Sequence, residues 1–570
     1  MTGVQTCALP IYKTGDSLLD GVVLEGLEME LRQSPMLKVR GDDAYQAGAQ
    51  QIRNESGEAA ANMSARKVAQ MIGAKAYLYG EISGGREEPY VISVDVLNTE
   101  SNDKLSSVEE TAGKQEEIPA AIERLAKTMR AEMGEAASTI EETSVGNEAL
   151  VNVAALHAYA LGEAAAQRGA TADAIKAYRQ AVTLDPRFVQ AQIRLAWLYR
   201  AEKAEVAAAN AASLAQDAAR QASDRERRLA EFCYAMNASG DYADALAIIR
   251  QYAELYPNDS EGLVGLARVL RAEGHLVEAL LAAQQAYGED PYQADAYREA
   301  ELAMIGLDRY DDALHLESQS QRLGVAPSGS SLAAAYLAGR NNIVAQEVGA
   351  LQRGAPGYGR LVDYGLYLDN TEQLSTGTTV WKGSMGRELA DTTGASGYML
   401  AQGALDRALA EHCGEALMMI RALKDLAQGP VASFNAGMAA AMCGDPAFAE
   451  RERNTLVQNY PQSTAVTQYY VPDLEAALEL AAKNPSNALD VLARIEQYDQ
   501  VSLTPYLRGL AHVAANDGSL AAADFQIVMA HRGAAFVLGS DVYPVAKIAL
   551  ARVSAMSAHA TVDSAMMPVR

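Results

Sequence analysis

The feature that most constrains this chain is a helix-pair pattern that is first clear between Ala155 and Pro186. Small and large apolar residues recur there at the spacing of two antiparallel helices. Gly162 and Ala174 are small enough to let the helices approach closely, and Leu161 and Tyr178 are expected to fill the seam between them. The segment ends in Asp-Pro, and proline cannot continue a helix. The pattern therefore predicts one complete helix–turn–helix unit.

The unit recurs along the chain. Two copies in direct succession end at Pro257 and Pro291, another ends at Pro461, and a last copy contains Gly518. One helix pair cannot bury its apolar face alone, so neighbouring pairs must stack on one another. The units resemble the tetratricopeptide repeat (TPR), a repeat of about 34 residues. The resemblance implies a mainly α chain, built as a TPR-type α-solenoid of antiparallel helix pairs.

The strength of the pattern divides the repeat region. It is clear, then weak, then clear again, and glycine-rich stretches at 354–359 and 375–397 are expected to be long loops. We interpret residues 153–325 as a TPR array, 326–397 as degenerate helical repeats, 398–556 as a TPR-like array and 557–570 as a frayed tail.

Residues 12–140 are interpreted as a small α/β domain that precedes the solenoid. An amphipathic helix is predicted over 16–34, and three strands follow at 76–83, 90–97 and 104–111. Because the domain begins with a helix, its first strand is expected to be missing. The polar residues 141–152 are interpreted as the linker to the repeats.

The stretches at 17–45 and 64–83 resemble a module of large multidomain bacterial signalling proteins. In those proteins the module lies between an N-terminal output domain and a TPR array, and a membrane span often precedes it. The output domain is a Ser/Thr kinase, a winged helix or a nucleotide cyclase, and the cyclase form occurs in peptide-modification systems. None of the motifs of these output domains occurs here, so their activities do not carry over to this chain.

Residues 1–11 differ from the rest of the chain. Their sequence, MTGVQTCALPI, resembles the translation of a common sequencing-library adapter. We interpret the segment as an artefact and exclude it from arguments about fold and targeting. The interpretation also implies that an upstream domain of the gene is missing.

Charge and cysteine content exclude several classes of function. The net charge of -25 disfavours non-specific binding to nucleic acid. The four cysteines form no CxxC motif and suggest no disulfide framework, and Cys233 and Cys443 are interpreted as small core residues. His412 and Cys413 are adjacent and point apart on a helix, so no metal site is predicted. No cofactor is predicted, no apolar run is long enough to span a bilayer, and the compartment stays open between cytoplasm and periplasm.

The candidate site is a binding surface. In TPR superhelices the first helix of each pair lines the concave face, so the resemblance places one set of arginine, aromatic and amide side chains there. These residues are Tyr159, Arg194, Trp197, Arg200, Tyr234, Asn237, Arg268, Arg271 and Arg298. Arginine suits carboxylate recognition and aromatic rings suit peptide contact, which predicts an acidic or C-terminal carboxylate peptide as partner. The alternative is that the arginines neutralise neighbouring acids.

Three functions are compatible with these observations. The first is a non-enzymatic protein-interaction or scaffold region, the sensory or regulatory C-terminal part of a larger bacterial signalling protein. The second is a fragment of an enzyme, a nucleotide cyclase or Ser/Thr protein kinase whose catalytic domain is missing. The third is a small-ligand sensor that binds through the α/β domain. For this chain itself we expect no enzymatic activity, because no phosphate-binding or nucleophile motif is present.

Overall fold

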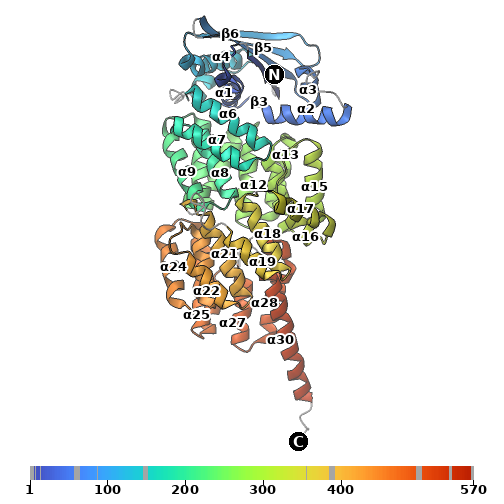
Figure 1. Cartoon of the computed structure of the whole chain (residues 1–570), viewed down its shortest axis with the longest axis vertical. Helices are drawn as coiled ribbons and strands as arrows, with labels where there is room; N and C mark the ends of the chain where they lie inside the picture. The colour runs from blue at the N-terminus through green and yellow to red at the C-terminus, as the bar shows by residue number, and fades with distance from the viewer. Residues whose placement is uncertain are drawn as a thin grey trace.

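The computed structural model describes residues 5–6, 8–12, 14–56, 64–85, 88–144, 152–354, 356–383, 392–495, 503–537 and 542–565. Three parts follow one another along the chain: an α/β domain, a first array of helix pairs and a second array. Figure 1 shows them stacked along the long axis of the molecule, with the α/β domain at one end and the last helix projecting from the other. The chain is therefore mainly α, a solenoid of antiparallel helix pairs preceded by a small α/β domain.

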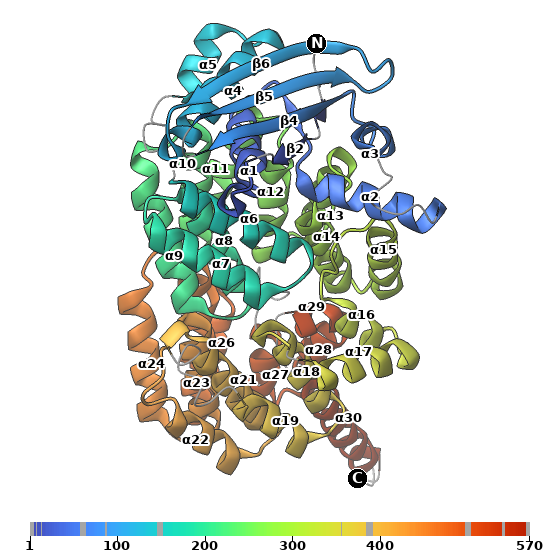
Figure 2. The same cartoon turned by 45° about the horizontal axis from the view of Figure 1, so that its top comes forward.

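The α/β domain is built on a sheet whose strand order is β2-β4-β5-β6 (Figure 2). Strand β2 runs parallel to β4, while β4, β5 and β6 are antiparallel neighbours. A short parallel pair, β1 with β3, forms a separate two-stranded sheet. The strands are β1 (Gln5–Thr6), β2 (Ala8–Tyr12), β3 (Lys38–Val39), β4 (Ala76–Gly85), β5 (Glu88–Asn98) and β6 (Lys104–Ala112). The three strands predicted from alternation are thus confirmed as β4 to β6.

One face of this sheet is buried by helices. Ile92, Val94 and Val96 alternate along β5 and share an apolar core with Leu27 of α1 and Leu125 of α4. The helices of the domain are α1 (Val22–Leu31), α2 (Asp42–Ser56), α3 (Ala65–Met71), α4 (Ile118–Glu132) and α5 (Ala137–Ser144). The amphipathic helix predicted over 16–34 is shorter than expected, because a separate 3-10 turn at Ser17–Leu19 precedes it.

Two interpretations of the N-terminal region stay predictions. Strand β2 lies within and just beyond the segment that we interpret as adapter-derived, and it pairs with β4 over five residues. Backbone pairing does not test where a gene segment comes from. The adapter origin of residues 1–11 and the loss of a first strand therefore stay predictions, which sequencing of the intact gene tests. Helix α5 enters the predicted linker, and residues 145–151 of that linker lie outside the described residues.

The first array contains five helix pairs that follow the predicted repeats. Their helices are α6 (Val153–Gln167), α7 (Thr171–Leu184), α8 (Val189–Ala201), α9 (Glu205–Ala218), α10 (Asp224–Tyr234), α11 (Tyr242–Leu255), α12 (Ser260–Ala272), α13 (Leu276–Glu289), α14 (Ala294–Gly306) and α15 (Tyr310–Arg322). The pairs α6–α7, α10–α11 and α12–α13 end close to the predicted repeat boundaries at Pro186, Pro257 and Pro291.

The seam of the first pair explains the small residues of the repeat. Ala174 and Tyr178 are buried, as predicted. A Cβ atom placed on Gly162 would lie only 2.5 Å from Cε1 of Tyr178, so glycine is what lets α6 and α7 approach. The prediction for Leu161 is wrong, since its side chain is 52% exposed. A residue next to the seam glycine points about 100° away from it on the helix, which turns Leu161 outward.

Replacing Gly162 by Ala should therefore destabilise the first array. The added methyl group would overlap the Tyr178 ring, and overpacking of this kind costs about 1–3 kcal/mol. Gly288→Ala is the matched control, because a Cβ atom there meets nothing within 4 Å and alanine favours helix. Chemical denaturation followed by circular dichroism measures both. A Gly162→Ala protein as stable as the control would contradict the close packing.

The second array is more regular than its sequence suggests. Its helices are α16 (Ser331–Leu337), α17 (Asn341–Arg353), α18 (Tyr358–Asn370), α19 (Leu374–Lys382), α21 (Ala395–Leu409), α22 (Cys413–Ala422), α23 (Pro430–Met442), α24 (Pro446–Asn459), α25 (Val471–Ala481), α26 (Pro485–Leu492), α27 (Thr504–Ala514), α28 (Gly518–Ala530), α29 (Arg532–Val537) and α30 (Val542–Ala565). None of the helices among the described residues is long and apolar enough to cross a membrane.

Two stretches were expected to be long loops. One of them is partly helical, and the other is a short connection. Helix α19 occupies the first part of the predicted loop at 375–397. A Cβ atom at Gly377 of this helix would lie 2.1 Å from Oδ1 of Asp369, so only glycine leaves room for that carboxylate. The 354–359 stretch is a short connection between α17 and α18. The predicted tail begins inside α30, which continues to Ala565 because no glycine or proline follows Pro544 of its first turn within the helix.

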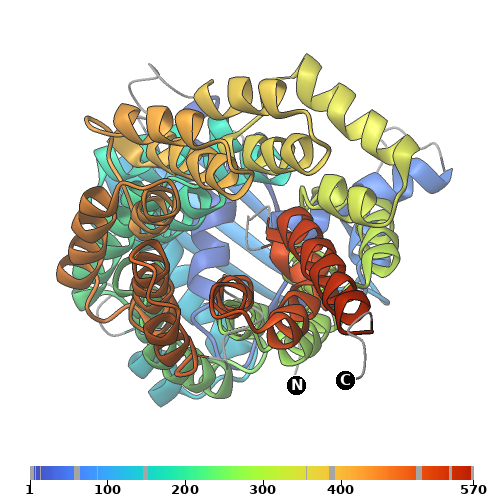
Figure 3. The same ribbon diagram turned by 90° about the horizontal axis from the view of Figure 1, so that it is seen from below.

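The two arrays touch through connections of the first and helix starts of the second. Thr464 donates its N–H to the Gly240 carbonyl at 2.9 Å, and Asp308 accepts the N–H of Gly533 at 2.7 Å. Seen end-on, the helices wrap around a common axis, with the α/β domain behind them (Figure 3). The α/β domain is held to the first array by ion pairs, Lys38 with Glu289 at 2.6 Å among them.

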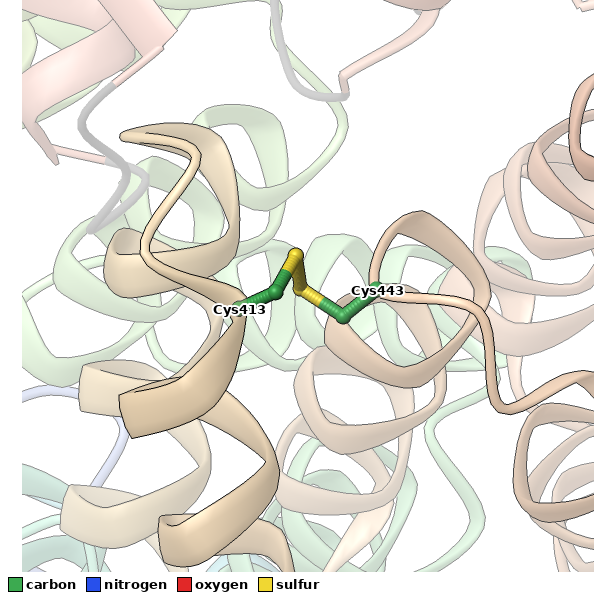
Figure 4. The surroundings of a disulfide bond; sticks show 2 residues. All are labelled: Cys413 and Cys443. Atoms are coloured by element: carbon green, nitrogen blue, oxygen red, sulfur yellow. A yellow bond between two sulfur atoms is a disulfide. The ribbon is translucent and has the colours of Figure 1, made fainter.

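A disulfide bond joins Cys413 and Cys443 in the second array (Figure 4). Cys413 is the first residue of α22, Cys443 directly follows α23, and their Cα atoms are 5.1 Å apart. The prediction of no disulfide, with Cys443 as a core residue, is therefore wrong. The sequence separation of 30 residues hides the pairing, because helix packing alone brings the two cysteines together. Cys233 is a buried free thiol, as expected, and burial raises its pKa to about 12.

Candidate functional site

The predicted binding residues lie on the first helices of the pairs, and several of them meet across the array. Arg194 of α8 contacts Glu163 of α6 at 2.9 Å and also approaches Glu261 of α12 at 3.6 Å. Arg268 of α12 lies over the ring of Trp197 of α8, 4.4 Å from its centroid. Helices α8 and α12 belong to different repeats, and one further repeat (α10–α11) lies between them. Side chains two repeats apart meet only on the inner side of a curved array.

Tyr159 is part of the core and is not available to a ligand. Its side chain is 4% exposed and packs between Tyr178 and Phe188, with ring centroids 5.5 and 4.9 Å away. Burial, reinforced by the negative charge of Glu163, raises the pKa of Tyr159 well above its usual value. The periodicity placed this residue on the right helix but could not show that the neighbouring helix covers it.

Arg194, Arg268 and Arg271 are neutralised by acids of adjacent repeats. Arg268 pairs with Glu299 at 3.1 Å and with Asp295, and Arg271 pairs with the same Glu299 at 2.8 Å. Although burial pushes the pKa of Glu299 up, the two arginines together hold it below its usual value. These three arginines therefore follow the alternative reading of the sequence, in which the cations neutralise neighbouring acids.

Arg200, Tyr234 and Asn237 form the middle of the predicted face. The Arg200 guanidinium donates to the carbonyl of Met236 at 3.0 Å and to Oδ1 of Asn237 at 3.5 Å. Asn237 in turn donates to the Cys233 carbonyl at 2.9 Å, and Tyr234 is half-buried. Unlike Arg194, Arg268 and Arg271, Arg200 thus bonds to neutral oxygens and to no carboxylate among the described residues.

Arg298 and Lys203 complete a group of cations that the sequence only partly indicates. Arg298 lies on α14, and Lys203 lies in the α8–α9 connection with a φ of 58°. Burial, together with the positive charges of Arg298, Arg200 and Arg271, lowers the pKa of Lys203. Sequence analysis missed Lys203 because it is in a connection, where helical periodicity says nothing about direction.

The acids beside these cations, Glu202 and Glu205, also bond to the second array. Glu202 accepts the backbone N–H of Tyr358, at the start of α18. Glu205 accepts the N–H groups of Val431 and Ala432 at the start of α23, both at 3.4 Å. Burial raises the pKa of Glu205 to about 7 despite these hydrogen bonds. Both carboxylates thus stabilise helix N-termini of the second array.

A pair of buried carboxyl groups lies where the two arrays join, away from this face. Glu301 is fully buried, and burial together with Glu317 raises its pKa to about 9. Ser330 donates to Glu301 at 2.6 Å, and Ser328 bridges the two carboxyl groups. Ser330 is therefore held as a donor and is not aligned with a base that would activate it as a nucleophile. Among the described residues there is also no group of three or more His, Cys, Asp or Glu that could hold a metal ion.

Comparisons with known proteins do not assign the chain to a family. No protein-family model matches the chain, and no curated protein sequence matches it. Among solved structures, the chain is similar to one in the crystal structure of the APC/C hetero-tetramer Cut9-Hcn1. The TM-score is 0.36 at 12% sequence identity, and the match covers 76% of this chain and 83% of that one. By its own helix pairs, the chain is a TPR-like α-solenoid with an N-terminal α/β domain.

Proposed function

We propose that this chain is a protein-interaction or scaffold region that binds a partner along the first helices of its pairs. The observation that carries the proposal is a set of contacts between helices two repeats apart: Arg268 lies over the ring of Trp197, and Arg194 approaches Glu261. Such a contact belongs to an inner, curved surface, and solenoids use such surfaces to hold extended segments of other proteins. Arginine and aromatic residues are also the types that contribute most at protein interfaces.

The chain is further proposed to be the sensory or regulatory C-terminal part of a larger bacterial signalling protein. The support is the resemblance of residues 17–45 and 64–83 to the module that joins an output domain to a TPR array. The partner is a protein, since the net charge of -25 disfavours nucleic acid. We propose no catalytic role for the chain, since the carboxyl group of Glu205 accepts backbone N–H groups of a helix start and that of Glu301 accepts the hydroxyl groups of Ser328 and Ser330.

Site-specific photo-crosslinking tests the interaction. A photoreactive phenylalanine analogue replaces Tyr234 on the predicted face, in cells that carry the intact gene. The control position is Leu281 of α13, the second helix of its pair, which is 60% exposed. We expect a discrete adduct with one protein at position 234 and none at 281, and the purified partner should bind the purified chain. The absence of an adduct at 234, or the same adduct at both positions, would contradict the proposal.

A further inference from the structure

One turn of the first array meets the starts of three helices of the second array. This segment, residues 202–206 between α8 and the first residues of α9, is called here the acidic turn. The carboxyl groups of Glu202 and Glu205 accept the first N–H groups of α18 and α23, as described above. Between them, Ala204 packs against Ala395, the first residue of α21. The acidic turn is therefore a joint between the arrays.

Glycines of the second array make room for this joint. The N-cap residues of α18, α21 and α23 are Gly357, Gly394 and Gly429, and none of the three helices has a side-chain cap of its own. A Cβ atom at Gly429 would lie 2.5 Å from Cβ of Glu205, and one at Gly357 would overlap the Glu202 carboxyl group. An acid or hydroxyl residue is the usual N-cap. Here carboxyl groups 156 and 226 residues away supply the hydrogen bonds for α18 and α23 instead.

Forming the joint takes both carboxyl groups out of water. Burial raises the pKa of Glu205 from its usual 4.5 to about 7, although two N–H groups and the charges of Arg200 and Lys203 act in the opposite direction. Burial likewise raises the pKa of Glu202. When the arrays separate, water solvates these groups and their ordinary pKa returns. Since the closed joint binds the proton of Glu205 more tightly than the open one, low pH favours the closed joint.

The other titratable groups around Glu205 come from both arrays. They are Arg200 and Lys203 at the end of α8, Glu202 in the turn, Asp363 of α18, Tyr398 of α21, Tyr460 after α24 and Tyr470 before α25. Burial raises the pKa of the three tyrosines above 10, so they are neutral at neutral pH. It also raises the pKa of Asp363, which gives that acid the same sign of effect as Glu205.

We propose that the acidic turn is a pH-sensitive latch between the two arrays, tightened when Glu205 is protonated and loosened when it ionises. The latch is at full strength below about pH 4.5, weakens as the pH rises to about 7, and changes little above that. The inference goes beyond the proposed function, because it concerns how the arrays are held together and not what they bind. Since the arrays wrap around a common axis, loosening the latch changes the shape of the surface that they enclose (Figure 3).

Amide hydrogen exchange of the whole chain, read by mass spectrometry at pH 5 and pH 8, tests the latch. After correction for the intrinsic effect of pH on exchange, peptides that contain the first turns of α18 and α23 should exchange at least tenfold faster at pH 8. Small-angle X-ray scattering should give a larger radius of gyration at pH 8 than at pH 5. Equal protection of these helix starts at both pH values overturns the proposal.

Variants assign the pH response to Glu205. In Glu205→Gln the amide oxygen still accepts an N–H group but cannot ionise, so the protection at pH 8 should equal that at pH 5. Glu254→Gln on α11 is the matched control, because Glu254 is exposed, and it should keep the full pH response. Gly429→Ala should expose the start of α23 at both pH values. The proposal is overturned if Glu205→Gln responds to pH like the unsubstituted chain, or if Gly429→Ala keeps the protection of α23 at pH 5.

Discussion

Replacing Arg407 by Ala should lower the free energy of unfolding of the second array by about 3–5 kcal/mol, the usual cost of removing one partner of a buried ion pair. Arg407 and Asp369 have no exposed side-chain surface, and their N–O distance is 2.9 Å. Trp381 donates its indole N–H to the other oxygen of Asp369 at 2.7 Å. Without the guanidinium, the carboxylate stays buried among apolar groups with only neutral donors.

The matched control is Arg340→Ala. Arg340 pairs with Asp311 at 2.8 Å, but both side chains are more than half exposed, so its loss should cost less than about 1 kcal/mol. Trp197 and Trp381 are the two tryptophans of the chain. In a Trp197→Phe background, the fluorescence of Trp381 therefore reports the unfolding of the second array alone, which matters because a chain of several parts need not unfold in one step. Equal stability of the Arg407→Ala and Arg340→Ala proteins would contradict a structural role for the buried pair.

The residues around this pair also show why the degenerate region was hard to read. Trp381 is fully buried in a slot made by Gly365 and Gly403, where added Cβ atoms would lie 2.4 and 2.6 Å from the indole. In the sequence, the glycine and threonine residues just before Trp381 indicate a loop, and nothing marks Gly365 and Gly403 as partners of the ring. In the structure they are the small residues that admit a large ring, so tertiary packing overrides local propensity.

The first array was predictable because its information is local. Gly162, Ala174 and Tyr178 are close in sequence, and their spacing alone predicts which surfaces pack. The same holds for the alternating strands β4 to β6. Periodicity assigned Arg194 and Arg268 to the first helices, but it could not show which acids they meet, because Glu163 and Glu299 come from other repeats.

Contacts between distant parts of the chain left no sequence signal. Glu205 and the start of α23 are 226 residues apart, and nothing in either segment indicates the hydrogen bond between them. Likewise, nothing in the sequence singles out Lys203, since a lysine in a helix connection is normally a solvated residue. The position of Lys203 beside the ring of Tyr398 therefore became visible only when the helices were placed in space.

Reducing the Cys413–Cys443 bond should destabilise the second array by about 2–4 kcal/mol, the typical contribution of a disulfide that closes a loop of this size. The bond spans 30 residues and ties the start of α22 to the end of α23. Opening it restores conformational freedom to the unfolded chain while the folded packing changes little. The melting temperature of the second array should therefore be lower with reductant than without it, and a Cys413→Ser/Cys443→Ser variant should match the reduced protein.

Cys233→Ser provides the control for thiol chemistry, because Cys233 is buried and unpaired. It should remove one titratable thiol from the denatured protein without changing the response to reductant.

Disulfides persist in oxidising compartments and are rare in the cytosol, so the bond also bears on where the second array is folded. Protein produced in an oxidising compartment should contain no reactive thiol at positions 413 and 443, and its melting temperature should fall when reductant is added. If both thiols react freely in such protein, or if reductant leaves the melting temperature unchanged, then the bond does not stabilise the second array, and α22 and α23 are held together by their apolar packing alone.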